Sequence, residues 1–303
     1  MNHSRPSATS GSPNPRYTPA LRDRRVLITG AARGIGAGLA DLLTAHGARV
    51  ALAGLEPEAL AGVADRNHAP WRECDVSDPA AVDTAVADLV GELGGLDVVV
   101  ANAGIAKQLP IIGGQPGVME AHLAVNTLGV FYTLRAAGPH ISHPRGYALA
   151  TASLAAAVQL PLLGAYSASK AAVEAIGNTF RQEVKPSGAK VGVAYYSELD
   201  TDMTSRGFST EAGTRLTGGG TVSGVAPMSA ALKALERGIA RRSRRIAAPF
   251  WVLPVVPARA LAQRVIELKP LPHLVESLEI ARREVVDYTT PQPSDGARHL
   301  EQP

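Results

Sequence analysis

Apolar positions along the chain recur with two periods, which alternate from residue 24 to about residue 200. Short aliphatic runs predict strands at 26–28, 49–53, 71–74, 96–101, 146–151 and 190–195. Ala- and Leu-rich stretches between them have helical spacing and predict helices at 35–46, 57–64, 77–93, 115–137 and 165–184, with Ser77 as an N-cap. Strands that alternate with helices favour right-handed βαβ units. We therefore predict an α/β fold, a doubly wound parallel sheet in a three-layer αβα sandwich.

The alternation runs without a linker, so a single domain is expected even though 303 residues could form two. A Ser-, Pro- and Gly-rich start predicts a disordered leader over 1–21, before a catalytic domain over 22–250. Residues 201–224 are rich in Thr, Ser and Gly and are typical of a mobile loop that covers a substrate. Amphipathic helical segments follow, and 251–303 is predicted to be a C-terminal extension and tail.

The composition excludes several classes of protein. A hydrophobic fraction of 46% excludes wholesale disorder, and the single Cys74 excludes a disulfide scaffold. A net charge of +3 without a dense basic stripe predicts no nucleic-acid partner. The longest apolar run, 246–257, contains three prolines, so we predict no membrane-spanning segment. The start of the chain lacks the apolar region of a secretory signal, and we expect a cytoplasmic protein. No metal site is predicted.

Residues 29–36, which read TGAARGIG, join the first predicted strand to the first predicted helix. A glycine-rich turn at a helix N-terminus is a seat for phosphate, because backbone N–H groups and the helix dipole face the anion. The strict G-x-G-x-x-G pattern fails because position 39 is Leu, and no P-loop Lys follows. An ordinary glycine-rich turn is the alternative interpretation.

Tyr166 and Lys170 lie four positions apart in a predicted helix and therefore share one face. A phenol has a pKa near ~10 and serves as an acid or base near neutrality only if its anion is stabilised, which a Lys ammonium one turn away would do. Ser153 follows a predicted strand, where its hydroxyl could bind a substrate carbonyl. The alternative for the pair alone is a solvated helix face.

With these residues placed, the chain resembles the short-chain dehydrogenase/reductase family, in its shorter single-domain branch. The glycine loop, Asp75-Val76, the Asn-Ala-Gly triplet at 102–104, Asn126, Ser153 and the Tyr166–Lys170 pair occur in the family's order and spacing. The resemblance is close over 22–205 and weak to 250. It implies a Rossmann-type, NAD(P)-binding catalytic domain.

The resemblance also implies a role for each matching residue. Ser153 would orient the substrate carbonyl, Tyr166 would transfer the proton, Lys170 would lower the pKa of Tyr166 and hold the nicotinamide ribose, and Asn126 would anchor a water that relays protons. The glycines of the loop would hold the pyrophosphate, Asp75 and Val76 the adenine, the 102–104 triplet the adenosine ribose, and Thr201 the nicotinamide amide. The predicted cofactor-binding residues are Gly30, Ala32, Arg33, Gly34, Ile35, Gly36, Asp75, Val76, Asn102, Ala103, Gly104, Tyr166, Lys170 and Thr201.

Two departures from the family pattern bear on function. Gly54 stands where an NAD-specific member would carry a carboxylate, and Arg33 could meet a 2′-phosphate, so NADP(H) is favoured. NAD(H) is the alternative, because Glu56 is close enough in sequence to accept from a ribose hydroxyl. Tyr196-Ser197 replace the usual Pro-Gly after the sixth strand, and Glu198 beside them is expected to be exposed.

These features predict an oxidoreductase that interconverts a carbonyl and a secondary alcohol. Apolar residues around the predicted site favour a lipophilic small-molecule substrate, although they could equally be core. The resemblance implies a homodimer or homotetramer through 115–137 and 165–184. Arginines within 237–245 indicate either peripheral contact with an anionic membrane or a solvated helix end. The alternative functions are a membrane-peripheral interaction protein and a cofactor-sensing protein without turnover.

Overall fold

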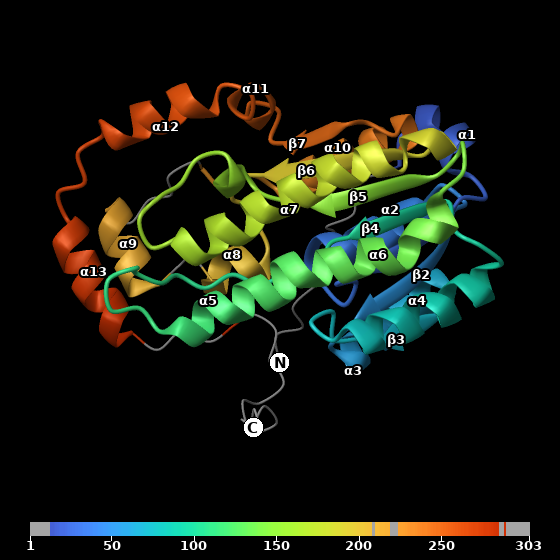
Figure 1. Cartoon of the computed structure of the whole chain (residues 1–303), viewed down its shortest axis with the longest axis horizontal. Helices are drawn as coiled ribbons and strands as arrows, with labels where there is room; N and C mark the ends of the chain where they lie inside the picture. Colours follow the sequence, from blue (N-terminus) through green and yellow to red (C-terminus); the bar gives the residue numbers. More distant parts are fainter. Residues whose placement is uncertain (1–12, 208–209, 219–223, 285–287, 289–303) are drawn as a thin grey trace, which may run out of the picture.

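The computed structural model describes residues 13–207, 210–218, 224–284 and 288, without the side chains of 205–207. Its centre is a parallel sheet in the order β3-β2-β1-β4-β5-β6-β7 (Figure 1). The strands are β1 (Arg25–Thr29), β2 (Arg49–Gly54), β3 (Trp71–Glu73), β4 (Val98–Ala101), β5 (Tyr147–Thr151), β6 (Lys190–Tyr196) and β7 (Arg245–Ala248). The strand order reverses between β1 and β4, which is where ligands bind in open sheets of this kind. The predicted doubly wound fold is confirmed.

Helices cover both faces of the sheet, so the strands read as nearly continuous apolar runs. One core lies beneath α4 (Pro79–Leu93), α6 (Gly129–Ile141) and α7 (Gly164–Glu183). The other lies beneath α2 (Gly34–Ala45), α3 (Pro57–Asn67) and α10 (Met228–Arg241). Leu27 of β1 faces the first core, whereas its neighbours Val26 and Ile28 face the second. This alternation along a single strand confirms the three-layer arrangement.

Three local predictions are corrected. The helix predicted at 115–137 is divided into α5 (Pro116–His122), the π-helical turn η2 (Leu123–Leu128) and α6. The N-cap of α4 is Asp78 rather than Ser77, because the Asp78 side chain accepts a hydrogen bond from the Ala80 backbone. Within 201–224, α8 (Asp202–Gly207) and α9 (Glu211–Thr217) form where only a loop was expected.

The predicted leader is wrong for its last residues. Residues 1–12 lie outside the described part of the chain, but Pro15–Tyr17 form η1 and Thr18–Leu21 form α1. The Asn14 backbone donates to the Glu236 carboxylate at 2.6 Å, and Leu21 is fully buried in the core. These contacts offset the entropy of ordering the segment, which composition alone could not reveal.

The C-terminal extension forms α11 (Val252–Val255), α12 (Arg259–Glu267) and α13 (Leu274–Arg283), which arch away from β7 (Figure 1). Val252 and Val256 are fully buried in the core beneath α7, so the arch begins on the domain itself. Its far end packs on α9, where Arg215 pairs with Glu276 at 2.6 Å. In the described ranges, every helix is too short or too polar to cross a membrane.

Candidate active site

A cavity of 1330 Å³ opens at the carboxyl ends of the central strands. It extends from the glycine loop, past Ser153 and Tyr166, to the C-terminal arch. Pockets for drug-sized ligands measure about 300–1,000 Å³, so this cavity has room for a nucleotide and a second molecule. All the residues predicted for the site line it except Gly36 and Asn126, which lie directly behind its wall.

The glycine loop has the shape that close approach of a phosphate requires. Gly30 has φ +65°, and a Cβ there would lie 2.6 Å from the Cα of Ala103. A Cβ on Gly36 would collide with the Gly30 carbonyl. Arg33 is the N-cap of α2 but makes no capping bond through its side chain, and Gly34 and Ile35 at the start of this helix line the cavity. The backbone N–H groups at such a helix start can bind an anion.

Asn102 braces the glycine loop through its side chain. Its Nδ2 donates to the carbonyl oxygens of Thr29 at 3.2 Å and Gly30 at 3.3 Å, while its backbone N–H donates to the Thr29 hydroxyl. Ala103 lines the cavity directly after it. The side chain of Asn102 therefore fixes the shape of the loop from behind, a role that the sequence did not reveal.

Asp75 forms a turn at the wall of the cavity. Its Oδ1 accepts from the backbone and hydroxyl of Ser77 at 2.9 and 2.8 Å, which makes an Asx turn. Asp75 also lines the cavity beside Val76. The turn therefore holds the carboxylate in place at the wall of the cavity that the glycine loop also lines.

Arg33 is paired with two carboxylates. Its Nε donates to Glu56 at 2.7 Å, its Nη2 makes a second bond to the same carboxylate, and its Nη1 lies 3.6 Å from Asp202. Glu56 follows β2, and Asp202 begins α8, so the pairing joins both sides of the cavity. The partner Asp202 was missed because only the fold brings it to Arg33.

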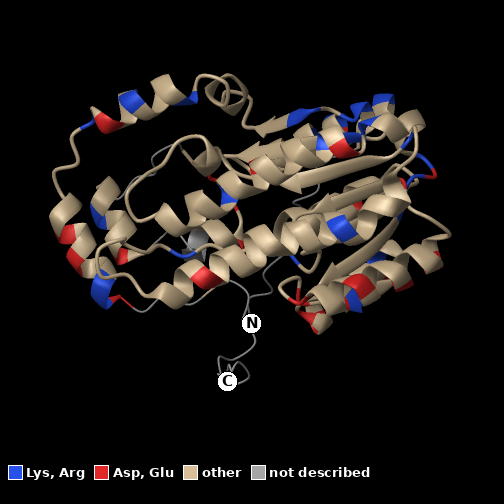
Figure 2. Cartoon of the chain, in the orientation of Figure 1, with Lys and Arg blue, Asp and Glu red and all other residues tan. Residues whose placement is uncertain are grey.

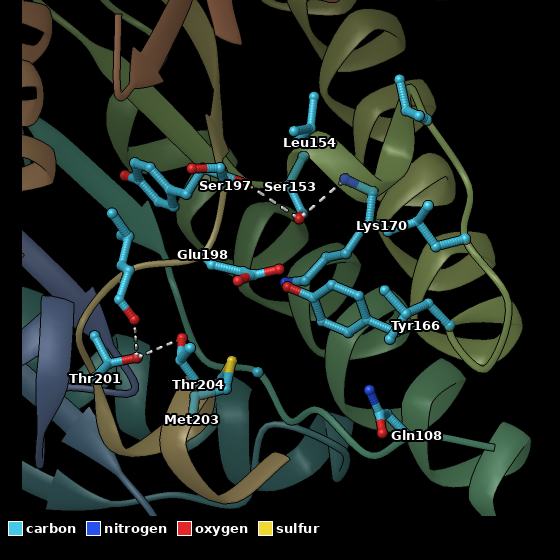
Figure 3. A pocket seen from close by; sticks show the side chains of 18 of the residues that line it. Gln108, Ser153, Leu154, Tyr166, Lys170, Ser197, Glu198, Thr201, Met203 and Thr204 are labelled. Carbon is cyan, nitrogen blue, oxygen red and sulfur yellow. Dashed lines mark hydrogen bonds between the residues drawn. The ribbon is translucent and has the colours of Figure 1, made fainter. Parts of the chain in front are cut away.

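Ser153, Tyr166 and Lys170 lie together and are buried, with Tyr166 and Lys170 one turn apart on α7 (Figure 3). The Ser153 hydroxyl donates to the Tyr196 carbonyl at 3.3 Å and accepts from the Ala155 backbone at 3.1 Å. Burial raises the pKa of Tyr166, and a hydrogen bond with Ser153 opposes that rise. Burial lowers the pKa of Lys170 to about 8. The Lys170 ammonium donates to the Thr151 carbonyl at 2.9 Å and lies 5.8 Å from the Tyr166 ring centre.

Asn126 is fully buried in the π-helical turn η2, a feature that often marks functional sites. Its Oδ1 accepts from the Ile105 backbone at 2.8 Å, and its Nδ2 donates to the Ile105 carbonyl and the Ser169 hydroxyl, each at 3.0 Å. A Cβ on Gly104 would lie 3.1 Å from Asn126 Oδ1 and 3.2 Å from Lys170 Nζ. The glycine therefore gives the close approach that brings these two polar groups together.

Glu198 corrects the expectation of an exposed side chain. It is half-buried and lines the cavity, and Figure 3 shows its carboxylate directed into the site from the end of β6. Thr201 lies further along the same wall, with its hydroxyl 3.4 Å from that of Thr204. The bend after β6 turns Glu198 inward. The sequence expectation rested on the general exposure of carboxylates and could not anticipate this bend.

The residues present fit a nicotinamide dinucleotide. At the glycine loop, side chains at Gly30 and Gly36 would collide with neighbouring backbone. The loop leads into α2, whose N-terminus has no side-chain cap. Further along the cavity, the Thr151 and Ser197 hydroxyls are buried and lack a hydrogen-bond partner among the described residues. Buried polar groups of this kind are usually satisfied, so a polar ligand is expected there. Fold and site together define a nucleotide-binding α/β protein in which Ser153, Tyr166 and Lys170 are buried at the cavity wall.

Comparisons with known proteins agree with this class. The sequence model of the short chain dehydrogenase family matches residues 24–212. The chain is 32% identical over 196 residues to L-2,3-butanediol dehydrogenase of Corynebacterium glutamicum, covering 59% of this chain and 76% of that protein. It is 37% identical over 174 residues to the short-chain dehydrogenase/reductase eriH of Hericium erinaceus, covering 54% and 69%.

A solved structure is also similar. A short chain dehydrogenase from Burkholderia cenocepacia, in complex with NADP, superposes with a TM-score of 0.67 at 27% identity, over 75% of this chain and 97% of that one. The chain belongs to the short-chain dehydrogenase/reductase family. The predictions of family and of a dehydrogenase/reductase enzyme are confirmed.

Proposed function

We propose that this protein is an NADP(H)-dependent oxidoreductase that interconverts a carbonyl and a secondary alcohol on a lipophilic small molecule, with Tyr166 as general acid and base. The observation that carries the proposal is the buried Ser153–Tyr166–Lys170 group on the wall of the cavity. Perturbed titratable groups that share a cleft are typical of catalytic sites.

The nicotinamide would supply or accept the hydride. In the direction of reduction, the Ser153 hydroxyl binds the carbonyl oxygen, and the Tyr166 phenol donates its proton to that oxygen. The neighbouring Lys170 ammonium stabilises the phenolate that results. In oxidation, the phenolate of Tyr166 takes the proton back from the alcohol. The amide of Asn126 holds the Ile105 backbone and Ser169, and Asn126 would anchor the water of the proposed proton relay.

Arg33 supports the preference for NADP(H), because a guanidinium binds a 2′-phosphate by paired hydrogen bonds. The B. cenocepacia relative was solved with NADP. Glu56 opposes this preference, since it already occupies two donors of Arg33. NADP(H) binding therefore requires Arg33 to exchange the Glu56 carboxylate for the phosphate. Titration of the protein with NADPH and NADH gives the two values of Kd, and a lower Kd for NADH would refute the preference.

An apolar wall supports a lipophilic substrate. Leu154, Val158 and Leu160 follow Ser153 along the cavity. One relative is named as an L-2,3-butanediol dehydrogenase, but the family match ends at residue 212 and does not cover the arch that completes this cavity. The substrate class is therefore proposed from this chain's own lining.

A homodimer or homotetramer remains our proposal for the assembly. Leu128 and Phe131, in η2 and α6, are large apolar side chains that are about half exposed on the predicted interface. Light scattering after gel filtration tests it, and a monomer at micromolar concentration would refute it. A cytoplasmic location is likewise proposed and is tested by cell fractionation.

In the fold, the arginines in 237–245 are separated from the exposed apolar residues that follow β7. Lys and Arg gather where β7 begins (Figure 2), whereas the exposed Phe250 and Trp251 follow its opposite end. Ile246 and Ala248 between them are buried. We therefore favour an enzyme over the membrane-peripheral alternative.

The experiment that tests the proposed function is a panel of aliphatic and polycyclic ketones and secondary alcohols, followed by NADPH absorbance. Turnover of apolar members is expected. A protein that binds NADPH but turns over no member of the panel would instead fit the cofactor-sensing alternative.

A further inference from the structure

The apolar stripe of helix α12 faces the cavity and not a protein core. The residues of α12 that line the cavity recur at helical spacing and are Leu261, Ala262, Val265 and Ile266. Ala258 and Lys269, on either side of the helix, also line the cavity. No residue of α12 is buried, and Leu261 and Val265 are 69% and 50% exposed. An amphipathic helix normally buries its stripe against the protein. Here the stripe is left available to a ligand in the cavity.

The stripe is continuous with the catalytic group through an apolar lining. Leu154 comes directly after Ser153 (Figure 3). Val158 and Leu160 also line the cavity. Trp251 and Val255, in and beside α11, complete the wall between the sheet and α12. A molecule whose oxygen reaches Ser153 would therefore extend along apolar side chains toward α12.

Polar contacts, and not apolar burial, hold α12 in position. Arg259 donates to Glu174 at 2.6 Å, and Glu174 is a nearly buried residue one turn after Lys170 on α7. The Gln159 backbone donates to Gln263 Oε1 at 2.8 Å, and Gln263 Nε2 donates back to the Gln159 carbonyl. Helix α7 and the loop after Ser153 are therefore both hydrogen-bonded to α12.

We propose that α12 is a specificity-determining roof of the substrate site, and that Leu261 and Val265 bind the apolar body of a neutral alcohol or ketone with a long hydrocarbon chain. This inference rests on the proposed function for the reacting oxygen. Its residues lie beyond the end of the family match at residue 212, so the roof belongs to this chain's own C-terminal extension.

The test compares the double variant L261S/V265S with the control L268S, which alters an exposed apolar residue of the same segment that does not line the cavity. The substrates are 2-alkanols from 2-butanol to 2-decanol with NADP⁺. Each buried methylene should raise kcat/KM about fourfold in the wild type. The double variant should lower the ratio of kcat/KM for 2-decanol over 2-butanol at least tenfold, and L268S should not. An unchanged ratio in the double variant would overturn the proposal.

A binding assay separates this inference from the proposed function. N-phenyl-1-naphthylamine, a neutral apolar fluorophore, should bind the full chain at one site, be displaced by 2-decanol, and bind at least tenfold more weakly to the double variant. If the wild type oxidises no alkanol but binds the probe in this way, the proposed role of α12 is supported and the proposed reaction is refuted. Equal probe binding by the three proteins would overturn the roof. A third measurement is binding to anionic phosphatidylserine vesicles. If the double variant lost vesicle binding but kept probe binding, the stripe would contact a membrane, and the proposed roof would be overturned.

Discussion

The pairing of Arg33 with Glu56 makes cofactor preference sensitive to a single substitution, Glu56→Gln. In the native protein the Glu56 carboxylate competes with a 2′-phosphate for Arg33. One hydrogen bond to a charged group contributes about 1.5–3 kcal/mol. The Arg33 side chain is 33% exposed, and solvent reduces the net contribution to about 1 kcal/mol. The neutral amide that Glu56→Gln introduces would therefore release Arg33 and lower the Kd for NADPH about fivefold.

The assay is fluorescence titration of NADPH and NADH at 25 °C in physiological salt, where the effect of distant charges is screened. The ratio of the NADPH Kd to the NADH Kd should fall about fivefold in Glu56→Gln. The matched control Glu58→Gln removes the carboxylate of an exposed residue two positions further on, which does not line the cavity, and should leave the ratio unchanged. A ratio that rises in Glu56→Gln, or an equal fall in both variants, would refute the reasoning.

Three further predictions concern stability and the catalytic helix. Glu236→Ala leaves the buried His46 Nε2 and the Asn14 backbone N–H without their acceptor, so urea unfolding should show a loss of about 2–5 kcal/mol; a loss below about 1 kcal/mol would contradict it. Gly104→Ala should lower kcat at least tenfold, because the added methyl group would crowd Asn126 and Lys170. The control Gly62→Ala, whose methyl group would have no neighbour within 4 Å among the described residues, should leave kcat unchanged, and equal kcat values for the two variants would contradict the prediction. Lys170→Met should raise the Tm at pH 7, because burial lowers the folded pKa of Lys170 to about 8 from 10.5 and the protonated form is destabilised. That advantage should shrink as the pH rises from 8 to 10.5, since the native protein then loses the buried charge, and a Tm difference independent of pH would refute it.

The sheet and the pairing of Tyr166 with Lys170 could be predicted because they depend on local signals. Short, continuous apolar runs such as Val98–Ala101 are typical of strands that are covered on both faces, so the strand positions followed from hydrophobicity. The spacing of Tyr166 and Lys170 fixes their relation within one helix turn, whatever surrounds the helix. The π-helical turn at Asn126 was missed, because one extra residue in a turn leaves no mark in the apolar pattern.

The rest depends on contacts between distant segments. Asp202 meets Arg33 from the far side of the cavity, and Glu236 meets Asn14 across 222 positions of sequence. The stripe of α12 has the same amphipathic pattern as a helix packed on a core, yet it faces a cavity. Periodicity identifies which face of a helix is apolar, but the fold decides what that face contacts.

The central claim is that the Tyr166 phenol transfers the proton of the reaction. The most direct measurement is turnover by Tyr166→Phe with a ketone or alcohol identified from the panel, together with its Kd for NADPH. The phenyl ring keeps the packing against His122, so binding of NADPH should remain within about twofold of the wild type. Turnover should fall by a factor of at least ~10²–10⁴, the range that a positioned general acid or base contributes. Wild-type turnover in Tyr166→Phe would contradict the account.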